Sequence, residues 1–221
     1  GIAAAQGGSD AAVHHRDSAG DAEVTAAAVR AAGVRATVLS ADLGDDPASL
    51  VGQAQGGLGP VTLLVNNASV FRDDRVETLT RESWDAHMEA NLHAPVALTQ
   101  AFAAALPGEA EGLVVNIVDQ RVWRPNPQFF SYSLSKAGLW WATRTMAQAL
   151  APRIRVNAIG PGPTLPSIHQ RPEDFEAEAA RIPLQRGTTP EQIGAVLRYL
   201  VEASSVTGQM IAVGGGQDLA L

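Results

Sequence analysis

Short runs of aliphatic and β-branched residues alternate with longer alanine-rich stretches along the chain. The short runs have the length of buried strands and cover residues 11–16, 35–42, 61–68, 112–119, 153–160 and 208–215. The longer stretches have the length and spacing of helices and cover residues 20–32, 81–105, 132–151 and 190–203. Because parallel strands need crossover connections, this alternation predicts an α/β fold with a doubly wound parallel sheet and helices on both of its faces.

No repeat divides the chain, and no linker rich in Pro, Gly or Ser does so, which predicts one domain over residues 1–221. Ligands of such folds bind beyond the carboxyl ends of the strands. Two segments are predicted to be irregular, residues 121–128 and residues 160–175. Because long loops in compact domains are often functional, we expect a substrate lid around residues 160–180, with an ordinary surface loop as the alternative.

Composition narrows the classes of partner and compartment. The net charge of −7 and the lack of a Lys/Arg cluster argue against nucleic acid as a partner. The longest apolar stretch, residues 93–108, contains Thr99 and Gln100 and is shorter than the roughly 20 residues that span a bilayer, so no membrane association is expected. With no cysteine, disulfides and thiolate zinc sites are excluded, which fits a cytoplasmic protein.

Residues 119–136 carry a group of reactive side chains. Tyr132 and Lys136 are four residues apart on a predicted helix and therefore share one face. A nearby ammonium stabilises a phenolate and lowers the pKa of a tyrosine, so this pair suits general acid and base catalysis. Asp119 lies at the end of a predicted strand, thirteen residues before the tyrosine, where a carboxylate should raise the pKa of Tyr132 by charge repulsion.

At these residues the chain resembles the short-chain dehydrogenase/reductase family, and the resemblance covers essentially the whole sequence. YSLSK at 132–136 matches the catalytic signature of the family, and Asn91 matches the asparagine of its catalytic tetrad. Further matches are VNNAS at 65–69, RIRVNAIGPGP at 153–163 and VTGQMIAVGGGQDL at 206–219. The resemblance implies a Rossmann-type fold and an oxidoreductase that uses a nicotinamide cofactor.

The family fold begins with a strand and a glycine-rich turn that meets the cofactor pyrophosphate. This chain begins with GIAAAQGG, residues 1–8, which is typical of the second half of a helix. We therefore expect that the first strand and the glycine-rich turn of the natural protein are missing from this chain. A divergent fold that never had this segment is the alternative.

The resemblance also implies which residues hold the cofactor. Arg16 and Ser18 follow the strand at which the family distinguishes its nicotinamide cofactors, and they offer a clamp for a 2′-phosphate. This favours NADPH/NADP+, although the neighbouring Asp17 weakens the argument. The other residues expected at the cofactor are Asp42, Leu43, Asn67, Ala68, Ser69, Tyr132, Lys136, Pro161, Gly162 and Thr164. His14 and His15 lack further ligand candidates at a suitable spacing, so no metal site is expected.

Asp119 departs from the family pattern, which has a serine at this position to hydrogen-bond the substrate carbonyl. A carboxylate needs donors from its substrate, which a simple ketone lacks and an aminopyrimidine-type heterocycle supplies. The aspartate is similar to that of the pteridine reductases, and Phe71 lies where those enzymes stack an aromatic ring on the pterin. The alternatives are that Gln120 or Ser131 performs the serine's task, and that Phe71 anchors a loop or the core.

The sequence therefore predicts an NADPH-dependent reductase of C=N or C=O bonds, acting on a pterin-like heterocycle such as a dihydropterin. Tyr132 would donate the proton directly or through Asp119, and Asn91 would hold a water that links Lys136 to solvent. Two alternatives stay open. One is a generic carbonyl reductase acting on an acyl, sugar or steroid-like ketone, and the other is a non-catalytic NADP(H)-binding module.

The family resemblance further implies a homotetramer in which the helices at 81–105 and 132–151 pack across subunit interfaces. Trp140 and Trp141 are candidates for these contacts, because large aromatic side chains are enriched at interfaces. Packing inside the subunit is equally expected for one of them.

Overall fold

The computed structural model describes residues 2–165 and 171–219. The strands of this part are β1 (Ala11–His15), β2 (Ala36–Ser40), β3 (Leu63–Asn66), β4 (Gly112–Ile117), β5 (Ile154–Pro161) and β6 (Met210–Val213). The α-helices are α1 (Ile2–Ala5), α2 (Ala19–Ala31), α3 (Ser49–Leu58), α4 (Arg81–Met88), α5 (Ala94–Ala105), α6 (Phe130–Leu150), α7 (Pro172–Arg181) and α8 (Pro190–Glu202). A π-helical turn, η1 (Glu89–His93), joins α4 to α5, and 3-10 turns form η2 (Gln120–Trp123) and η3 (Gln217–Leu219). All the predicted strands are confirmed.

The strand pairing is parallel throughout the described residues, and it falls into two sheets. β1 pairs with β2, while β3, β4, β5 and β6 are neighbours in that order. No pairing joins β1 to β3 in this part of the chain, so each keeps an unpaired edge. An unpaired edge can accept a further strand, and the strand expected before Gly1 stays a prediction.

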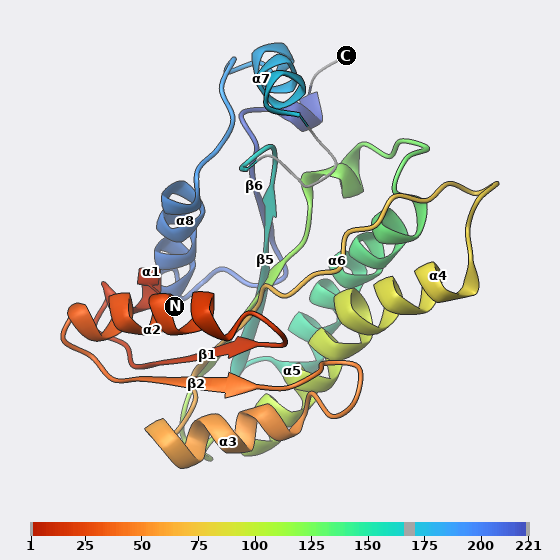
Figure 1. The fold of residues 1–221 in the computed structure, drawn as a ribbon. Coiled ribbons are helices and arrows are strands. Elements are labelled where there is room, and N and C mark those ends of the chain that lie inside the picture. Colours follow the sequence, from red (N-terminus) through yellow and green to blue (C-terminus); the bar gives the residue numbers. More distant parts are fainter. Residues whose placement is uncertain (1, 166–170, 220–221) are drawn as a thin grey trace.

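Helices cover both faces of the larger sheet, as the sequence predicts. Successive side chains of a strand point to opposite faces. Val114 of β4 accordingly belongs to a core with Phe102 of α5, and Val115 belongs to another core with Leu200 of α8. Figure 1 shows α8 on one side of β5 and β6, with α6 and α4 on the other side. The strand ends between these layers are therefore held from both faces.

The helices differ from the prediction in three places. The predicted helix at 81–105 contains the π-helical turn, and α3 was not predicted at all. The segment at 160–175, predicted to be irregular, begins with the last two residues of β5 and becomes helical at Pro172, so this prediction is wrong at both ends, and its residues 166–170 lie outside the described residues. The reason is local, because α7 starts with a proline in its first turn and places Glu173 and Asp174 at the positive end of the helix dipole.

Candidate active site

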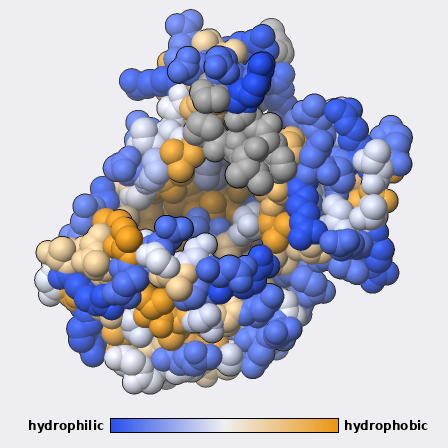
Figure 2. All heavy atoms as spheres, viewed as in Figure 1, coloured by the Kyte–Doolittle hydropathy of each residue, from blue (hydrophilic) through white to orange (hydrophobic). Residues whose placement is uncertain are grey.

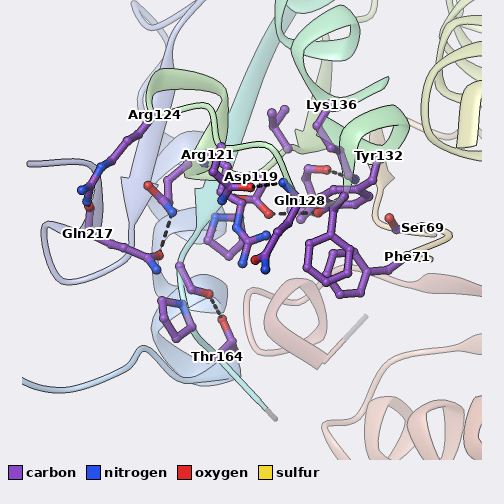
Figure 3. Close-up of a pocket in the computed structure, with 18 of the residues that line it drawn as sticks. Ser69, Phe71, Asp119, Arg121, Arg124, Gln128, Tyr132, Lys136, Thr164 and Gln217 are labelled. Atoms are coloured by element: carbon purple, nitrogen blue, oxygen red, sulfur yellow. Dashed lines mark hydrogen bonds between the residues drawn. The ribbon is translucent and has the colours of Figure 1, made fainter. Parts of the chain in front are cut away.

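The carboxyl ends of β3, β4 and β5 open onto a cleft of about 1170 Å³ (Figure 3). The cleft is lined by ten of the residues that the sequence singles out, namely Asn67, Ser69, Phe71, Asp119, Gln120, Tyr132, Lys136, Pro161, Gly162 and Thr164. Figure 2 shows the molecule hollowed beside the layer of β1 and β2, with apolar residues in the depth of the hollow. Phe175 and Glu178 of α7 also line the cleft, so the expected lid segment borders the site, while its movement stays a prediction.

Tyr132 and Asp119 are in direct contact in this cleft. The Tyr132 hydroxyl donates to Asp119 Oδ2 at 3.0 Å, and Asp119 Oδ1 accepts from the backbone N–H of Arg121 at 2.8 Å. Burial raises the pKa of Tyr132 well above its usual value, and the Asp119 carboxylate raises it further. Burial also raises the pKa of Asp119. The predicted effect of the carboxylate on the tyrosine is confirmed in direction, and Tyr132 is a protonated phenol at neutral pH.

Lys136 lies one helical turn after Tyr132 and is almost completely buried. Its Nζ donates to the backbone oxygen of Ile117 at 2.8 Å and lies 5.8 Å from the centroid of the Tyr132 ring. Burial lowers the pKa of Lys136 to about 8, although Asp119 opposes this shift. Arg121 lowers the pKa of Tyr132, but burial outweighs this effect, and the expected lowering of the Tyr132 pKa by Lys136 stays a prediction.

Asn91 is fully buried in the π-helical turn η1. Its Oδ1 accepts from the N–H of Val70 at 2.8 Å, and its Nδ2 donates to the oxygen of Val70 at 2.9 Å and to Ser135 Oγ at 3.1 Å. The amide therefore holds the loop after β3 against α6, next to Phe71. A π-helical turn often marks a functional position in a helix. The expected water held by Asn91 stays a prediction.

Aromatic rings form one wall of the cleft. Phe71 stacks on Phe129 with centroids 4.3 Å apart, and it meets the Tyr132 ring edge to face at 4.7 Å. Phe129 has a φ of 54° at the start of α6, a left-handed conformation that is strained for a residue with a side chain. Phe71 thus lines the cleft and anchors its loop at the same time, so both readings of this residue have structural support.

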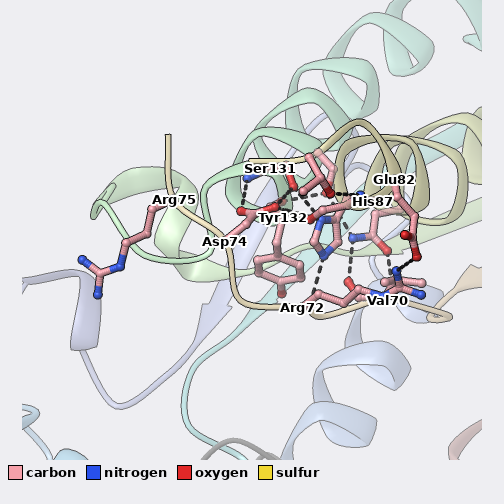
Figure 4. A network of polar contacts seen from close by, with 12 residues as sticks. Val70, Arg72, Asp74, Arg75, Glu82, His87, Ser131 and Tyr132 are labelled. Carbon is pink, nitrogen blue, oxygen red and sulfur yellow. Dashed lines mark hydrogen bonds and ion pairs between the residues drawn. The ribbon is translucent and has the colours of Figure 1, made fainter. Parts of the chain in front are cut away.

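A buried network that the sequence analysis missed holds the start of α6 (Figure 4). His87 Nε2 accepts from the N–H of Arg72 at 3.0 Å, so the neutral imidazole carries its proton on Nδ1 and donates it to Ser131 Oγ at 2.6 Å. Ser131 donates its hydroxyl to Asp74 Oδ2 and its N–H to Asp74 Oδ1 at 2.9 Å, and Ser83 Oγ also donates to Asp74 Oδ2. The network fixes the residue next to Tyr132.

This network bears on the two residues that could take the place of the family serine, Gln120 and Ser131. Ser131 is fully buried, does not line the cleft and bonds to Asp74 and His87. Gln120 does line the cleft, donates from Nε2 to Gln217 Oε1 at 2.7 Å and leaves its buried Oε1 without a partner. The structure therefore does not place Ser131 in the serine's role.

Comparison with known proteins identifies the family of this chain. A family model described as Enoyl-(Acyl carrier protein) reductase matches residues 1–218. The chain belongs to the short-chain dehydrogenase/reductase family. Its family relatives include 3-oxoacyl-(acyl-carrier-protein) reductase FabG of Thermotoga maritima, 37% identical over 163 residues, a match that covers 72% of this chain and 66% of the relative. Nodulation protein G of Rhizobium sp. is 33% identical over 196 residues, which is 80% of each chain.

A solved structure of the family resembles this chain more closely in sequence. It is described as FolM Alternative dihydrofolate reductase 1 from Brucella suis in complex with NADP. The two chains are 52% identical, with a TM-score of 0.96, and the match covers 99% of this chain and 89% of the Brucella chain. The Brucella canis protein of the same name, also complexed with NADP, has the same identity and TM-score.

The residues that the family resemblance assigns to the far end of the cofactor lie outside the cleft but at the same edge of the fold. Arg16 and Ser18 follow β1, and both are exposed. Arg16 Nε is 2.7 Å from Asp17 Oδ2, so Asp17 offsets part of the positive charge that a 2′-phosphate would need. Asp42 follows β2 and accepts from the N–H of Gly44 at 2.9 Å.

The other residues expected at the cofactor are Leu43, Ala68 and Gly162, and two of them are in close packing contacts. Leu43 is buried in the core with α5, so its side chain is a packing residue. Ala68 is exposed in the loop after β3, between Asn67 and Ser69 of the cleft. Gly162 runs against Gly214, and a Cβ built on Gly162 would lie 2.6 Å from the Cα of Gly214, so this turn needs a glycine for close approach.

The remaining expectations concern metals, membranes and assembly. The described residues contain no group of three His, Cys, Asp or Glu side chains that could hold a metal ion, and His14 Nε2 is 2.9 Å from the oxygen of Ala41. None of the described helices is long and apolar enough to cross a bilayer. Trp140 packs partly buried against a core cluster, while Trp141 is 66% exposed on α6. The homotetramer and the cytoplasmic location stay predictions.

Proposed function

We propose that this protein is an NADPH-dependent reductase of a pterin-like heterocycle, with Asp119 as the residue that selects the substrate and Tyr132 as the proton donor. The observation that carries the proposal is the direct bond from the Tyr132 hydroxyl to Asp119 Oδ2 inside the cleft. A family serine would offer a hydroxyl donor here, whereas Asp119 offers an acceptor oxygen. The site therefore suits a substrate that presents N–H donors next to the bond to be reduced.

The residues at the strand ends fit a nicotinamide cofactor. Lys136, Asn67 and Thr164 bring an ammonium, an amide and a hydroxyl into one cleft, which are the groups that bind ribose hydroxyls and a carboxamide. NADPH, when bound, supplies the hydride. Arg16 at the end of β1 is the candidate for the 2′-phosphate. The Brucella proteins that are 52% identical to this chain were solved with NADP, which supports the same choice.

The protonation state of Tyr132 is compatible with a reductase. A reductase must deliver a proton to the atom that becomes negative as hydride arrives. The raised pKa of Tyr132, caused by burial and then by Asp119, keeps a proton on its hydroxyl at neutral pH. The raised pKa of Asp119, caused by burial, lets the carboxyl accept and pass on a proton more readily than an exposed aspartate. The Tyr132 hydroxyl therefore carries the proton that a reductase needs to deliver.

The wall of the cleft fits a flat substrate. Phe71 lies in the loop after β3 and lines the cleft, and its ring meets the Tyr132 ring edge to face, so a planar ring beside Phe71 would also be within reach of the tyrosine. The names of the Brucella proteins, dihydrofolate reductases, point to the same class of ring. These observations support a dihydropterin as the substrate class.

The test is NADPH oxidation by the wild-type protein with a dihydropterin and with a simple ketone, repeated with Asp119→Ser and Asp119→Asn. We expect the wild-type protein to prefer the dihydropterin. Asp119→Ser should lower kcat/KM for the dihydropterin by about ten- to one-hundredfold, the usual value of a hydrogen bond to a charged group, and should lower it less for the ketone. Equal losses on both substrates, or a wild-type protein that prefers the ketone, would refute the role of Asp119.

A generic carbonyl reductase is the second candidate, and the FabG and nodulation protein relatives favour it. For that function Asp119→Ser should improve reduction of a ketone, because the serine restores a hydroxyl donor to the carbonyl oxygen. The non-catalytic alternative predicts NADPH binding with no turnover of either substrate. The same assay therefore separates all three functions.

A further inference from the structure

Arg121 lines the cleft, and its guanidinium group has no ion-pair partner among the described residues. Its Nη1 is buried and has no hydrogen-bond partner, and none of the ion pairs among the described residues includes it. A guanidinium keeps its charge at any ordinary pH and has five N–H donors. Because Arg121 as a whole is half-buried and lines the cleft, a ligand that brings an acceptor oxygen to the cleft side of its guanidinium group gains charge-assisted hydrogen bonds.

The guanidinium is held in a defined place. Its central carbon lies 5.5 Å from the centroid of the Phe129 ring, within the range of a cation–π contact. The backbone N–H of the same residue donates to Asp119, so Arg121 begins next to the reacting centre. Figure 3 shows Arg121 beside Asp119, facing the same cleft as Tyr132 and Phe71.

A second arginine extends this arrangement toward solvent. Arg124 follows Arg121 by three residues and is the residue directly after the 3-10 turn η2. Both line the cleft, and exposure increases from the half-buried Arg121 to the exposed Arg124. Arg124 Nη1 makes one long contact of 3.3 Å with the oxygen of Gln217. The two cations therefore mark a path from the reacting centre outward.

Three acidic residues line the cleft, Asp73, Asp119 and Glu178, and in the described part of the chain none of them forms an ion pair with Arg121 or Arg124. Asp119 is occupied by the Tyr132 hydroxyl and by a backbone N–H. Glu178 accepts from Gln217 Nε2 at 2.7 Å. The chain as a whole carries a net charge of −7, so a pair of arginines in one cleft stands out against the overall charge of the protein.

We propose that Arg121, supported by Arg124, binds a carboxylate on the tail of the substrate, so that the reduced heterocycle is one with an acidic side chain. This inference rests on the proposed function and deepens it, because it chooses between dihydropterins with acidic tails and those with neutral tails. Arg121 binds the carboxylate by charge-assisted hydrogen bonds, while Asp119 contacts the ring. Arg124 adds a weaker contact at the solvent end.

The experiment measures kcat/KM for dihydrofolate, which has an acidic tail, and for dihydrobiopterin, whose tail is neutral, in the wild-type protein and in Arg121→Gln. Because Arg121 also affects Tyr132, the result to read is the ratio of the two kcat/KM values. We expect the ratio of dihydrofolate to dihydrobiopterin to fall by about ten- to one-hundredfold in Arg121→Gln, mainly through the KM of dihydrofolate. Arg124→Gln should lower the same ratio by about two- to fivefold.

The controls separate this inference from general effects of charge and from the proposed function. Arg75→Gln removes an exposed arginine outside the cleft and should leave the ratio unchanged. Raising the salt from 0.05 M to 0.5 M should increase the KM of dihydrofolate more than that of dihydrobiopterin. If Arg121→Gln does not fold, Arg121→Lys, Arg124→Gln and the salt series carry the test.

The outcomes are distinct. An unchanged ratio in both Arg121→Gln and Arg124→Gln overturns the carboxylate site while the reductase function stands. If the wild-type protein reduces neither substrate, the proposed function fails. Titration of the NADPH-loaded protein with folate and with neutral biopterin then decides the site separately, since Arg121→Gln must weaken the binding of folate by at least about tenfold more than that of biopterin.

Discussion

The network around Asp74 makes a quantitative prediction about stability. Asp74 is 4% exposed and accepts the N–H and the hydroxyl of Ser131 and the hydroxyl of Ser83. Burial disfavours the charged form of Asp74, but the hydrogen bonds from Ser131 and Ser83 outweigh it and lower the pKa of the carboxyl. Asp74→Ala removes the shared acceptor and leaves these donors behind.

The expected loss follows from those donors. Ser131 is fully buried, so leaving its N–H and its hydroxyl unpaired should each lower the free energy of unfolding by about 1–3 kcal/mol. The half-buried Ser83 can instead form a hydrogen bond to water. Removal of the buried charge returns part of this energy. We expect Asp74→Ala to lower the free energy of unfolding by about 3–4 kcal/mol, a large fraction of the about 5–15 kcal/mol of an ordinary domain.

The assay is urea unfolding at pH 7 and at one fixed protein concentration, followed by the fluorescence of the four tryptophans. Asp74→Asn keeps one acceptor oxygen, so its loss should be smaller, about 1–2 kcal/mol. Asp73→Ala removes an exposed carboxylate next in the chain and should change stability by no more than about 0.5 kcal/mol. A loss in Asp74→Ala below about 1 kcal/mol, or equal to that of Asp73→Ala, would refute the reasoning.

Three further predictions test other parts of the structure. Gly162→Ala places a Cβ 2.6 Å from a backbone carbon, so it should cost about 1–3 kcal/mol in urea unfolding and weaken NADPH binding; a neutral result contradicts the close approach. His87 is buried and neutral, and burial lowers its pKa below 6.5. As the pH falls, His87 therefore takes up a proton in the unfolded chain before it does so in the folded protein. The free energy of unfolding should decline as the pH falls below about 6.5. His87→Gln should flatten that decline between pH 7 and 5, and an unchanged slope would exclude His87 as its source. Thr189→Ala removes the capping box of α8 and should lower the free energy of unfolding in urea by about 1 kcal/mol. Thr189→Ser keeps a hydroxyl at this position and should retain most of the stability.

Periodicity and spacing were sufficient for much of the fold and for the reactive pair. The strands at the centre of the sheet read as apolar runs because both of their faces are covered, as Val114 and Val115 show. The spacing of Tyr132 and Lys136 placed them on one face of a helix, and Asp119 stood out because a carboxylate beside a reactive phenol is unusual. Each of these signals depends on residues close together in the chain.

Tertiary structure decided what local sequence could not. The helix α3 contains three glycines, which disfavour helix formation, and it is held by the burial of Leu50 and Val51 against the core. The direction of the Tyr132 pKa follows from burial, which depends on the whole fold.

The network that holds Tyr132 in place is the clearest case of long-range organisation. It joins Asp74, His87 and Ser131, and the first and last of these are 57 residues apart. No pattern of residues adjacent in the sequence predicts such contacts, because they form only when the loop after β3 packs on α6. The sequence by itself therefore determined the elements and the reactive residues of this protein, and packing between distant segments determined their protonation, their positions and the unpaired Arg121 beside them.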